Sequence, residues 1–170
     1  MNFAKINTHD IANGPGVRVS LFVSGCRRHC PGCFNVEAQN FDYGYYFTPI
    51  TIRRIIELLE ADHINGLTIL GGEPMEPENV MSVCYLMECV RDQFGDTKTI
   101  WLYSGFTFEE LISRDEEYTN GILSLADVMV DGPYIEAERD ITLKFRGSRN
   151  QRIIDLNKTF VKGSVVLYEV

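Results

Sequence analysis

The stretch SGCRRHCPGCFN runs from Ser24 to Asn35 and directly follows the apolar run Val17–Val23. Its three cysteines, Cys26, Cys30 and Cys33, have the spacing C-x3-C-x2-C. A run of β-branched and apolar residues predicts a buried strand. Three thiolates on one short loop can bind three corners of a four-iron cluster, which leaves one iron without a protein ligand. Because an open coordination position is typical of a metal site that performs chemistry, the loop predicts a catalytic iron–sulfur site at a strand end.

Other interpretations of the three cysteines remain open. They could be ordinary thiols, or they could bind zinc together with His29 or a distant residue. An iron–sulfur protein without catalysis would take a fourth ligand from Cys84 or Cys89. Cys84 lies on the apolar stripe of a predicted helix, so we interpret it as a core residue, whereas Cys89 has no assigned role.

The composition narrows the class of protein. The chain has 170 residues, and 24 acidic against 16 basic side chains give a net charge of −8. An acidic chain is a poor candidate for binding nucleic acid, which requires cations to displace counterions. No apolar run is long enough for a signal peptide or a membrane span, so we expect a cytoplasmic protein with reduced thiols. Five cysteines in that compartment favour metal binding or catalysis over disulfides.

Strand signals and helix signals alternate along the chain. The predicted strands are Val17–Val23, Leu67–Leu70, Thr99–Tyr103 and Val128–Val130. The predicted helices begin at Pro49, at Pro77 (ending near Phe94) and after Thr107, which forms a capping box with Glu110. The C-terminal residues 158–170 are expected to form a hairpin that turns near Gly163.

This alternation predicts a single α/β domain over residues 1–170, with a curved, mainly parallel sheet of five or six strands. A complete eight-fold barrel needs about 250 residues, so we expect a truncated, partial TIM-like barrel. The C-terminal ends of the strands form one rim in such folds. The loops that follow the predicted strands should therefore converge on one mouth, which would bring the cysteine loop close to Gly71-Gly72, Ser104-Gly105 and Asp131-Gly132.

A second motif, Gly71-Gly72-Glu73-Pro74, follows the second of these strands. The glycines let the backbone approach a ligand closely, Glu73 is an anion that suits an ammonium group, and Pro74 stiffens the turn. Taken alone, the motif could be a simple strand-to-helix turn. Together, C-x3-C-x2-C after a first strand and GGEP after a later strand resemble the radical S-adenosylmethionine (SAM) enzymes.

The resemblance implies a cofactor set and a chemistry. The three cysteines would bind a 4Fe-4S cluster whose open iron takes the amino and carboxylate groups of SAM. One electron from the reduced cluster would break the sulfonium bond, and the resulting 5′-deoxyadenosyl radical would abstract a hydrogen atom. Phe34 would pack on the adenine, or else it is a core aromatic. The implied SAM-binding residues are Gly32, Cys33, Phe34, Gly71, Gly72, Glu73 and Pro74.

Three further stretches narrow the resemblance. DIANGPGVRVSLFVSGC (residues 10–26), IWLYSGF (100–106) and DGPY…LKFRGSRNQRIIDL (131–156) are similar to the activating enzymes of anaerobic, class III ribonucleoside-triphosphate reductase. Only the end after Asn157 falls outside the similarity. The resemblance implies a small oxidoreductase that places a radical on a glycine of the reductase, and it implies a low-potential one-electron donor such as flavodoxin. Within the superfamily, a pyruvate formate-lyase-type activase or another small radical SAM enzyme remains an alternative.

A basic segment stands out in this acidic chain, with Arg146, Arg149 and Arg152 close together. These side chains could contact the carboxylate of SAM or an acidic surface of the reductase. They could equally form local salt bridges on a solvated face. Asp131, at a strand end, could bind SAM, but we favour a role in a turn.

Overall fold

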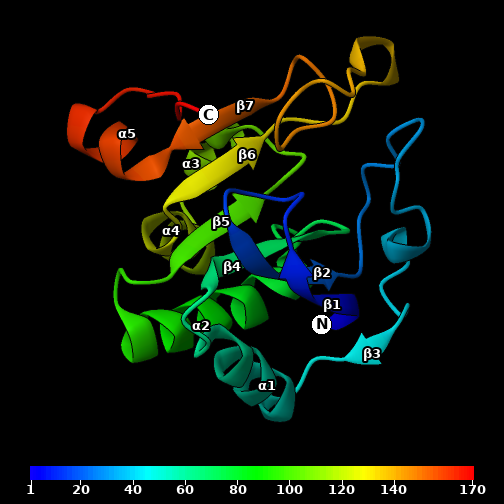
Figure 1. Cartoon of the computed structure of the whole chain (residues 1–170). Helices are drawn as coiled ribbons and strands as arrows, with labels where there is room; N and C mark the ends of the chain where they lie inside the picture. Colours follow the sequence, from blue (N-terminus) through cyan, green and yellow to red (C-terminus); the bar gives the residue numbers. More distant parts are fainter.

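The computed structural model describes residues 1–170, in which helices follow strands over most of the length (Figure 1). The strands are β1 (Asn2–Asp10), β2 (Val17–Val23), β3 (Tyr45–Tyr46), β4 (Ile64–Gly71), β5 (Thr99–Tyr103), β6 (Val128–Asp131) and β7 (Arg152–Asp155). The helices are α1 (Pro49–Leu59), α2 (Pro77–Phe94), α3 (Phe108–Arg114), α4 (Glu117–Leu125) and α5 (Leu156–Lys162), with short 3-10 turns at Glu37–Gln39 and Glu136–Glu138. None of these helices combines the length and the apolar character that crossing a membrane would require.

All seven strands belong to one sheet, in the order β3-β1-β2-β4-β5-β6-β7. The four central strands, β2, β4, β5 and β6, are parallel, as expected from the alternation of strands and helices. The flanking strands β1, β3 and β7 pair antiparallel. The sheet is open, with β3 and β7 at its two edges, so the likeness to part of a TIM barrel remains a prediction.

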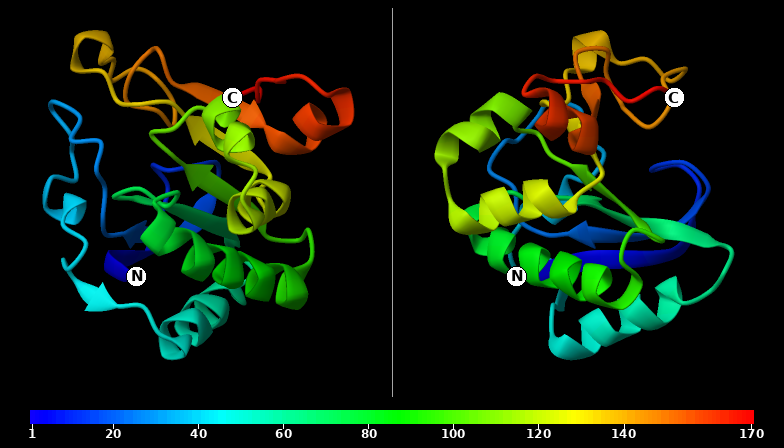
Figure 2. Two further views of the ribbon diagram at one scale, coloured as in Figure 1. Left: turned by 180° about the vertical axis from the view of Figure 1, so that it is seen from behind. Right: turned by 90° about the vertical axis from the view of Figure 1, so that its left-hand side faces the viewer.

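The two faces of the sheet differ in what covers them. Figure 2 shows α1, α2 and α4 on one face, and the large apolar cluster of the protein lies between these helices and the strands. Alternate residues point to opposite faces of a strand. Leu102 of β5 therefore joins the large cluster, while its neighbour Trp101 belongs to a small cluster on the opposite face with Val128, Val130 and Ile153. We call the helix-covered face the outer face and the opposite one the inner face.

The inner face buries one cation, Arg18 of β2. Its side chain is fully buried and lies over the ring of Trp101, with 5.6 Å from Cζ to the ring centroid. The guanidinium donates to Thr68 Oγ1 (2.7 Å), to the Leu67 carbonyl (2.8 Å) and to the Thr99 carbonyl (2.9 Å). Burial lowers the pKa of Arg18 to about 10. Neutral oxygens thus satisfy this arginine, which braces β2 against β4 and β5.

The local signals in the sequence located most of the helices correctly. Pro49 occupies the first turn of α1, and α2 begins and ends where the apolar stripe predicts. Thr107 and Glu110 form the expected capping box of α3, with Thr107 Oγ1 accepting from the Glu110 N–H at 3.2 Å. These helix starts were predictable because capping residues act within one turn.

Several elements differ from the sequence-based prediction. The sheet has seven strands rather than five or six, because β1, β3 and β7 lacked a clear signal. β1 has mostly half-exposed side chains, and its pairing with β2 comes from backbone hydrogen bonds. The helix α4 was also missed.

The prediction of a C-terminal hairpin over 158–170 is wrong. The segment begins with helix α5, whose N-terminal N–H of Lys158 donates to Asp155 Oδ1 at 2.9 Å. The helix ends at Gly163, which adopts the left-handed φ of 71° that helix C-termini favour. The remaining residues return along β7, where the Tyr168 N–H donates to the Ile153 carbonyl at 2.8 Å. The apolar residues of this segment are compatible with either a hairpin or a helix. The cap at Asp155 and the left-handed Gly163 favour the helix.

Candidate active site

One cavity lies at the C-terminal ends of the parallel strands. It encloses about 200 Å³ of space and is open to solvent at its mouth. Its walls come from the loops after β2, β4, β5 and β6, which confirms that these loops converge on one mouth. In Figure 1 the segments 24–44 and 132–150 lie on the same side of the molecule, beyond the ends of β5 and β6.

The cysteine loop forms one wall of this cavity. Cys26, Cys30 and Cys33 are free, partly exposed thiols, and all three line the cavity. The loop is held by backbone hydrogen bonds from Gly25 N to Ala38 O (2.8 Å) and from Cys26 N to Gln39 O (3.0 Å). The short 3-10 turn Glu37–Gln39 thus fixes the position of the first residues of the loop.

The two other cysteines lie elsewhere. Cys84 is buried in the large apolar cluster and lies within 3.8 Å of Glu88 Oε1, which confirms its interpretation as a core residue. Cys89 packs partly against the same cluster on α2. Neither lines the cavity. His29 also lies outside the lining, and its Nδ1 pairs with Gln39 Oε1 at 2.8 Å.

Three thiols that line one cavity could each bind one iron of a four-iron cluster. No group of three or more His, Cys, Asp or Glu side chains lies close enough to hold one metal ion. A four-iron cluster binds each thiolate at a different iron, so its ligands stand apart around a shared space. Burial, with smaller contributions from Glu73 and Glu76, raises the pKa of Cys26 to about 11. A thiol in that environment gives up its proton when it binds a metal.

Gly71 and Gly72 allow the end of β4 to contact the cysteine loop. A Cβ on Gly72 would lie 2.6 Å from the Gly25 carbonyl oxygen, and Gly71 has a φ of 116°. The Gly72 N–H donates to Val23 O at 2.7 Å, and the Glu73 N–H donates to Gly25 O at 2.8 Å. The sequence suggested that these glycines let a ligand approach, but their nearest neighbours are backbone atoms: Val23 at the end of β2 beside Gly71, and Gly25 and Ala38 beside Gly72. Both glycines also line the cavity.

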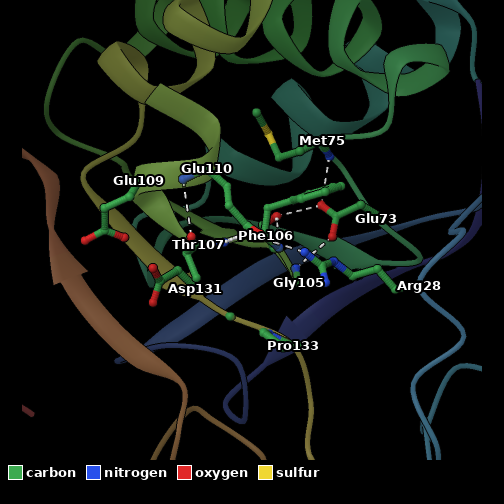
Figure 3. A network of polar contacts seen from close by, with 12 residues as sticks. Arg28, Glu73, Met75, Gly105, Phe106, Thr107, Glu109, Glu110, Asp131 and Pro133 are labelled. Atoms are coloured by element: carbon green, nitrogen blue, oxygen red, sulfur yellow. Dashed lines mark hydrogen bonds and ion pairs between the residues drawn. The ribbon is translucent and has the colours of Figure 1, made fainter. Parts of the chain in front are cut away.

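Glu73 is almost completely buried at the base of the cavity (Figure 3). Its Oε1 accepts hydrogen bonds from the Met75 N–H (3.0 Å) and the Ser104 hydroxyl (2.8 Å), and its Oε2 accepts one from the Gly105 N–H (2.7 Å). Burial raises the pKa of Glu73, while these hydrogen bonds oppose the shift. The carboxylate therefore connects the turn after β4 with the turn after β5.

Of the remaining residues implied by the resemblance, Phe34 lines the cavity and two others do not. Phe34 lines the cavity, is 72% exposed, and lies at 5.6 Å between ring centroids from Tyr134. It is therefore a rim residue and not a core aromatic. Gly32 and Pro74 do not line the cavity. Gly32 has a φ of 74° and leaves no room for a side chain beside Glu136, so it shapes the loop.

The three arginines of the basic segment do not line the cavity, and each binds groups of its own chain. Arg146 donates to the Gln151 carbonyl at 2.6 Å, and Arg149 pairs with Asp140 at 3.1 Å. Arg152 forms ion pairs with Glu109 and with the buried Asp131. Asp131 also accepts from the Phe108 N–H at 2.8 Å, which supports its role at a turn.

The sequence reasoning missed several polar lining residues. The cavity is also lined by Arg28, Asn35, Gln39, Tyr103, Tyr134 and Gln151. The Gln151 side chain accepts from the Gly147 N–H (2.9 Å) and donates to the Gly132 carbonyl (3.1 Å), so it ties the loop after β6 to the segment before β7. The only sequence signal for these missed residues was their position next to one of the motifs or at the end of a predicted strand.

Comparisons with known proteins agree with this arrangement. The family described as "4Fe-4S single cluster domain" matches residues 12–154. An anaerobic ribonucleoside-triphosphate reductase-activating protein of Vibrio cholerae is 38% identical over 155 residues, which cover 90% of this chain and 97% of that protein. The protein of the same name from Enterobacteria phage T4 is 37% identical, with 90% and 93% covered. The one from Escherichia coli K12 is 35% identical, with 89% and 96% covered.

Proposed function

The chain belongs to the family of anaerobic ribonucleoside-triphosphate reductase-activating proteins, and from this premise we propose that it is a radical SAM activase. Cys26, Cys30 and Cys33 would hold a 4Fe-4S cluster with one open iron. Such a cluster supplies the electron that breaks a carbon–sulfur bond of SAM and starts hydrogen abstraction from a glycine of the reductase. The observation that carries the proposal is that the three thiols and the Gly71–Glu73 turn line the same cavity.

The cysteine loop and the turn after β4 would act as one preformed unit. Hydrogen bonds from Gly72 N and Glu73 N, to Val23 O and Gly25 O, fix the turn against the loop that presents Cys26. A ligand that contacts the turn therefore lies next to whatever the cysteines bind. This adjacency supports a reaction in which the cluster and SAM must be in contact.

Glu73 would attract the ammonium group of SAM. An ionised carboxylate offers about four acceptor sites, and three are occupied by Met75, Ser104 and Gly105. One acceptor direction is left for a ligand. The same hydrogen bonds fix the carboxylate in place, so little conformational entropy is lost when the ligand binds.

Phe34 and the exposed rim would meet the adenine or the reductase. An exposed aromatic at a cavity mouth offers a stacking surface to a ligand base. The glycine-bearing segment of the reductase would enter through the same open mouth. We further propose a cytoplasmic setting, where thiols remain reduced, and an external low-potential electron donor of the flavodoxin type.

Anaerobic purification followed by iron and sulfide reconstitution tests the proposal. We expect about four irons per chain, since the donor set fits a four-iron cluster. Addition of SAM and a chemical reductant should release methionine and 5′-deoxyadenosine. Addition of the anaerobic reductase should then produce a glycyl radical signal in electron paramagnetic resonance spectra.

Each failure in this series points to a different class of protein. Zinc in place of iron would identify a zinc module. A stable cluster without SAM cleavage would identify an electron-transfer protein. SAM cleavage that activates pyruvate formate-lyase and not the ribonucleotide reductase would identify a different activase.

A further inference from the structure

The cavity has one positive and one negative side chain in its lining. Arg28 is the only Lys or Arg among the lining residues, and Glu73 is the only carboxylate. A free amino-acid group carries one ammonium and one carboxylate. The charges of the wall therefore complement the amino-acid end of SAM only if both side chains take part.

Arg28 lies in the cysteine loop but extends across to the turn after β5 (Figure 3). Gly105 leaves the space that it occupies, because a Cβ there would lie 2.4 Å from Arg28 Cδ. The guanidinium carbon lies 4.2 Å from the ring centroid of Phe106. Arg114 covers the same ring, with its guanidinium carbon 4.1 Å from the centroid. The stacking on Phe106 holds the Arg28 head group in place.

The donors of Arg28 are largely unused. Its Nε is buried and has no hydrogen-bond partner, and Nη2 approaches Glu110 at 3.5 Å. The Arg28 charge is also close enough to Glu73 to oppose the rise in the pKa of that carboxyl. The adjacent Arg27 is different. Its backbone N–H donates to Glu76, and its guanidinium pairs with Glu76 and Glu78. Two neighbouring arginines thus divide the work, since Arg27 anchors the loop to α2 while Arg28 keeps free donors at the cavity.

A buried donor without a partner is costly unless a ligand satisfies it. We propose that Arg28 binds the carboxylate of SAM, next to the ammonium group that Glu73 attracts. This inference rests on the proposed function. The planar guanidinium suits a carboxylate because its N–H groups match the two oxygens. Arg28 is then a ligand-binding residue that the C-x3-C-x2-C spacing does not specify.

Binding of two ligands to the reconstituted protein tests this assignment. The ligands are SAM and decarboxylated SAM, which keeps the ammonium and sulfonium groups but lacks the carboxylate. Arg28→Gln should weaken SAM binding about 10- to 100-fold, as expected for loss of a charged hydrogen bond. The same variant should bind decarboxylated SAM as well as the unchanged protein does. Arg28→Lys should recover part of the loss, because it keeps the charge but not the fork.

The matched control is Arg114→Gln, which removes the second guanidinium that contacts the Phe106 ring and lies outside the cavity lining. Arg114 also donates to the Met75 carbonyl at 2.8 Å, so any effect of this variant acts through the turn after β4 and should be equal for the two ligands. Equal weakening of both ligands by Arg28→Gln would overturn the proposal. So would an unchanged SAM affinity accompanied by a shifted reduction potential of the cluster, which would assign Arg28 to tuning the iron site. If the unchanged protein bound no SAM at all, the proposed function itself would fail.

Discussion

The two faces of the sheet differ in role: the outer face holds most of the apolar core, and the inner face leads to the cavity. The outer face packs apolar side chains such as Leu21, Ile69 and Leu102 under the helices, without a break. The inner face has a small apolar cluster around Trp101, and it also buries charged groups such as Arg18. At the C-terminal ends of the strands, the inner face opens into the cavity with the three cysteines.

The difference shows how a short chain combines stability with an open site. Burial of apolar area stabilises the fold and is roughly proportional to the area removed from water. That burial is concentrated on the outer face, so the inner face can keep polar groups and an open mouth. We therefore expect substitutions on the outer face to change stability, and substitutions at the cavity to change ligand binding.

The largest expected effect lies at the cavity. Cys33→Ala should abolish stable cluster binding and SAM cleavage, while the free energy of unfolding of the metal-free protein changes little because the thiol is partly exposed. Iron content and visible absorption after reconstitution measure the first effect, and denaturant unfolding measures the second. Cys84→Ala is the control on the outer face. Loss of the cluster in a folded Cys84→Ala protein would contradict the division between the faces.

The second-largest effect is expected from truncation of a buried side chain on the outer face. Leu102→Ala should lower the free energy of unfolding by about 2–5 kcal/mol, because it leaves a cavity in a fully buried cluster. The fraction that remains folded should still bind iron after reconstitution. Urea unfolding followed by circular dichroism gives the energy. If Leu102→Ala lowered the free energy of unfolding by less than about 0.5 kcal/mol, as a surface substitution does, the inner face would contribute more stability than its small cluster indicates.

Glu73→Gln separates charge from shape at the base of the cavity. The variant keeps the size of the side chain but removes the negative charge and replaces one accepting oxygen by an amide NH2. SAM affinity should therefore fall at least about tenfold, which corresponds to about 1.4 kcal/mol. Iron content should remain unchanged, because Glu73 contacts backbone and Ser104 and no cysteine thiol. Equilibrium binding on the reconstituted protein measures the change. Normal affinity in this variant would remove Glu73 from the proposed SAM site.

Substitutions in the C-terminal tail test how much the tail contributes to the stability of the inner face. Tyr168 lies edge-on to Trp101, with 5.3 Å between ring centroids. Such pairs contribute about 0.5–1.5 kcal/mol beyond area burial, so Tyr168→Phe should be nearly neutral and Tyr168→Ala should destabilise by about that amount or more. Thermal unfolding of the two variants provides the comparison. Equal stability of Tyr168→Ala and the unchanged protein would show that the tail does not support the inner face.

The smallest expected effect is a pH dependence in the loop before β7. Hydrogen bonds from Thr142 and Arg149 lower the pKa of Asp140 to about 2. A carboxyl with a lowered pKa stabilises the folded state above its unfolded value of 3.8, and this contribution is lost as the pH falls through about 2. Asp140→Asn should therefore flatten the stability profile slightly between these pH values. An unchanged slope in acid unfolding experiments would contradict the lowered pKa of Asp140.

The sequence by itself determined the features that depend on near neighbours in the chain. The spacing of the three cysteines, the extent of α2 and the capping box at Thr107 are all set within one or two turns of backbone. The parallel order of the central strands also followed, because a strand, a helix and a further strand connect with little freedom. The convergence of the loops on one rim is a consequence of that order.

The tertiary structure alone decided which groups are already satisfied. Glu73 and the arginines at 146, 149 and 152 are ionisable side chains in any fold, but hydrogen bonds from other segments determine how many of their donor and acceptor sites are free. The same holds for Arg27 and Arg28, which are neighbours in the sequence and differ in their ion pairs because Glu76, at the N-cap of α2, and Glu78 pair with Arg27. Long-range pairing also placed β1 and β7 at the flanks of the sheet, since their own residues carry weak strand signals. Contacts between residues far apart in the chain leave no local pattern, so the sequence identified the chemistry of this site while the fold determined which side chains are available for it.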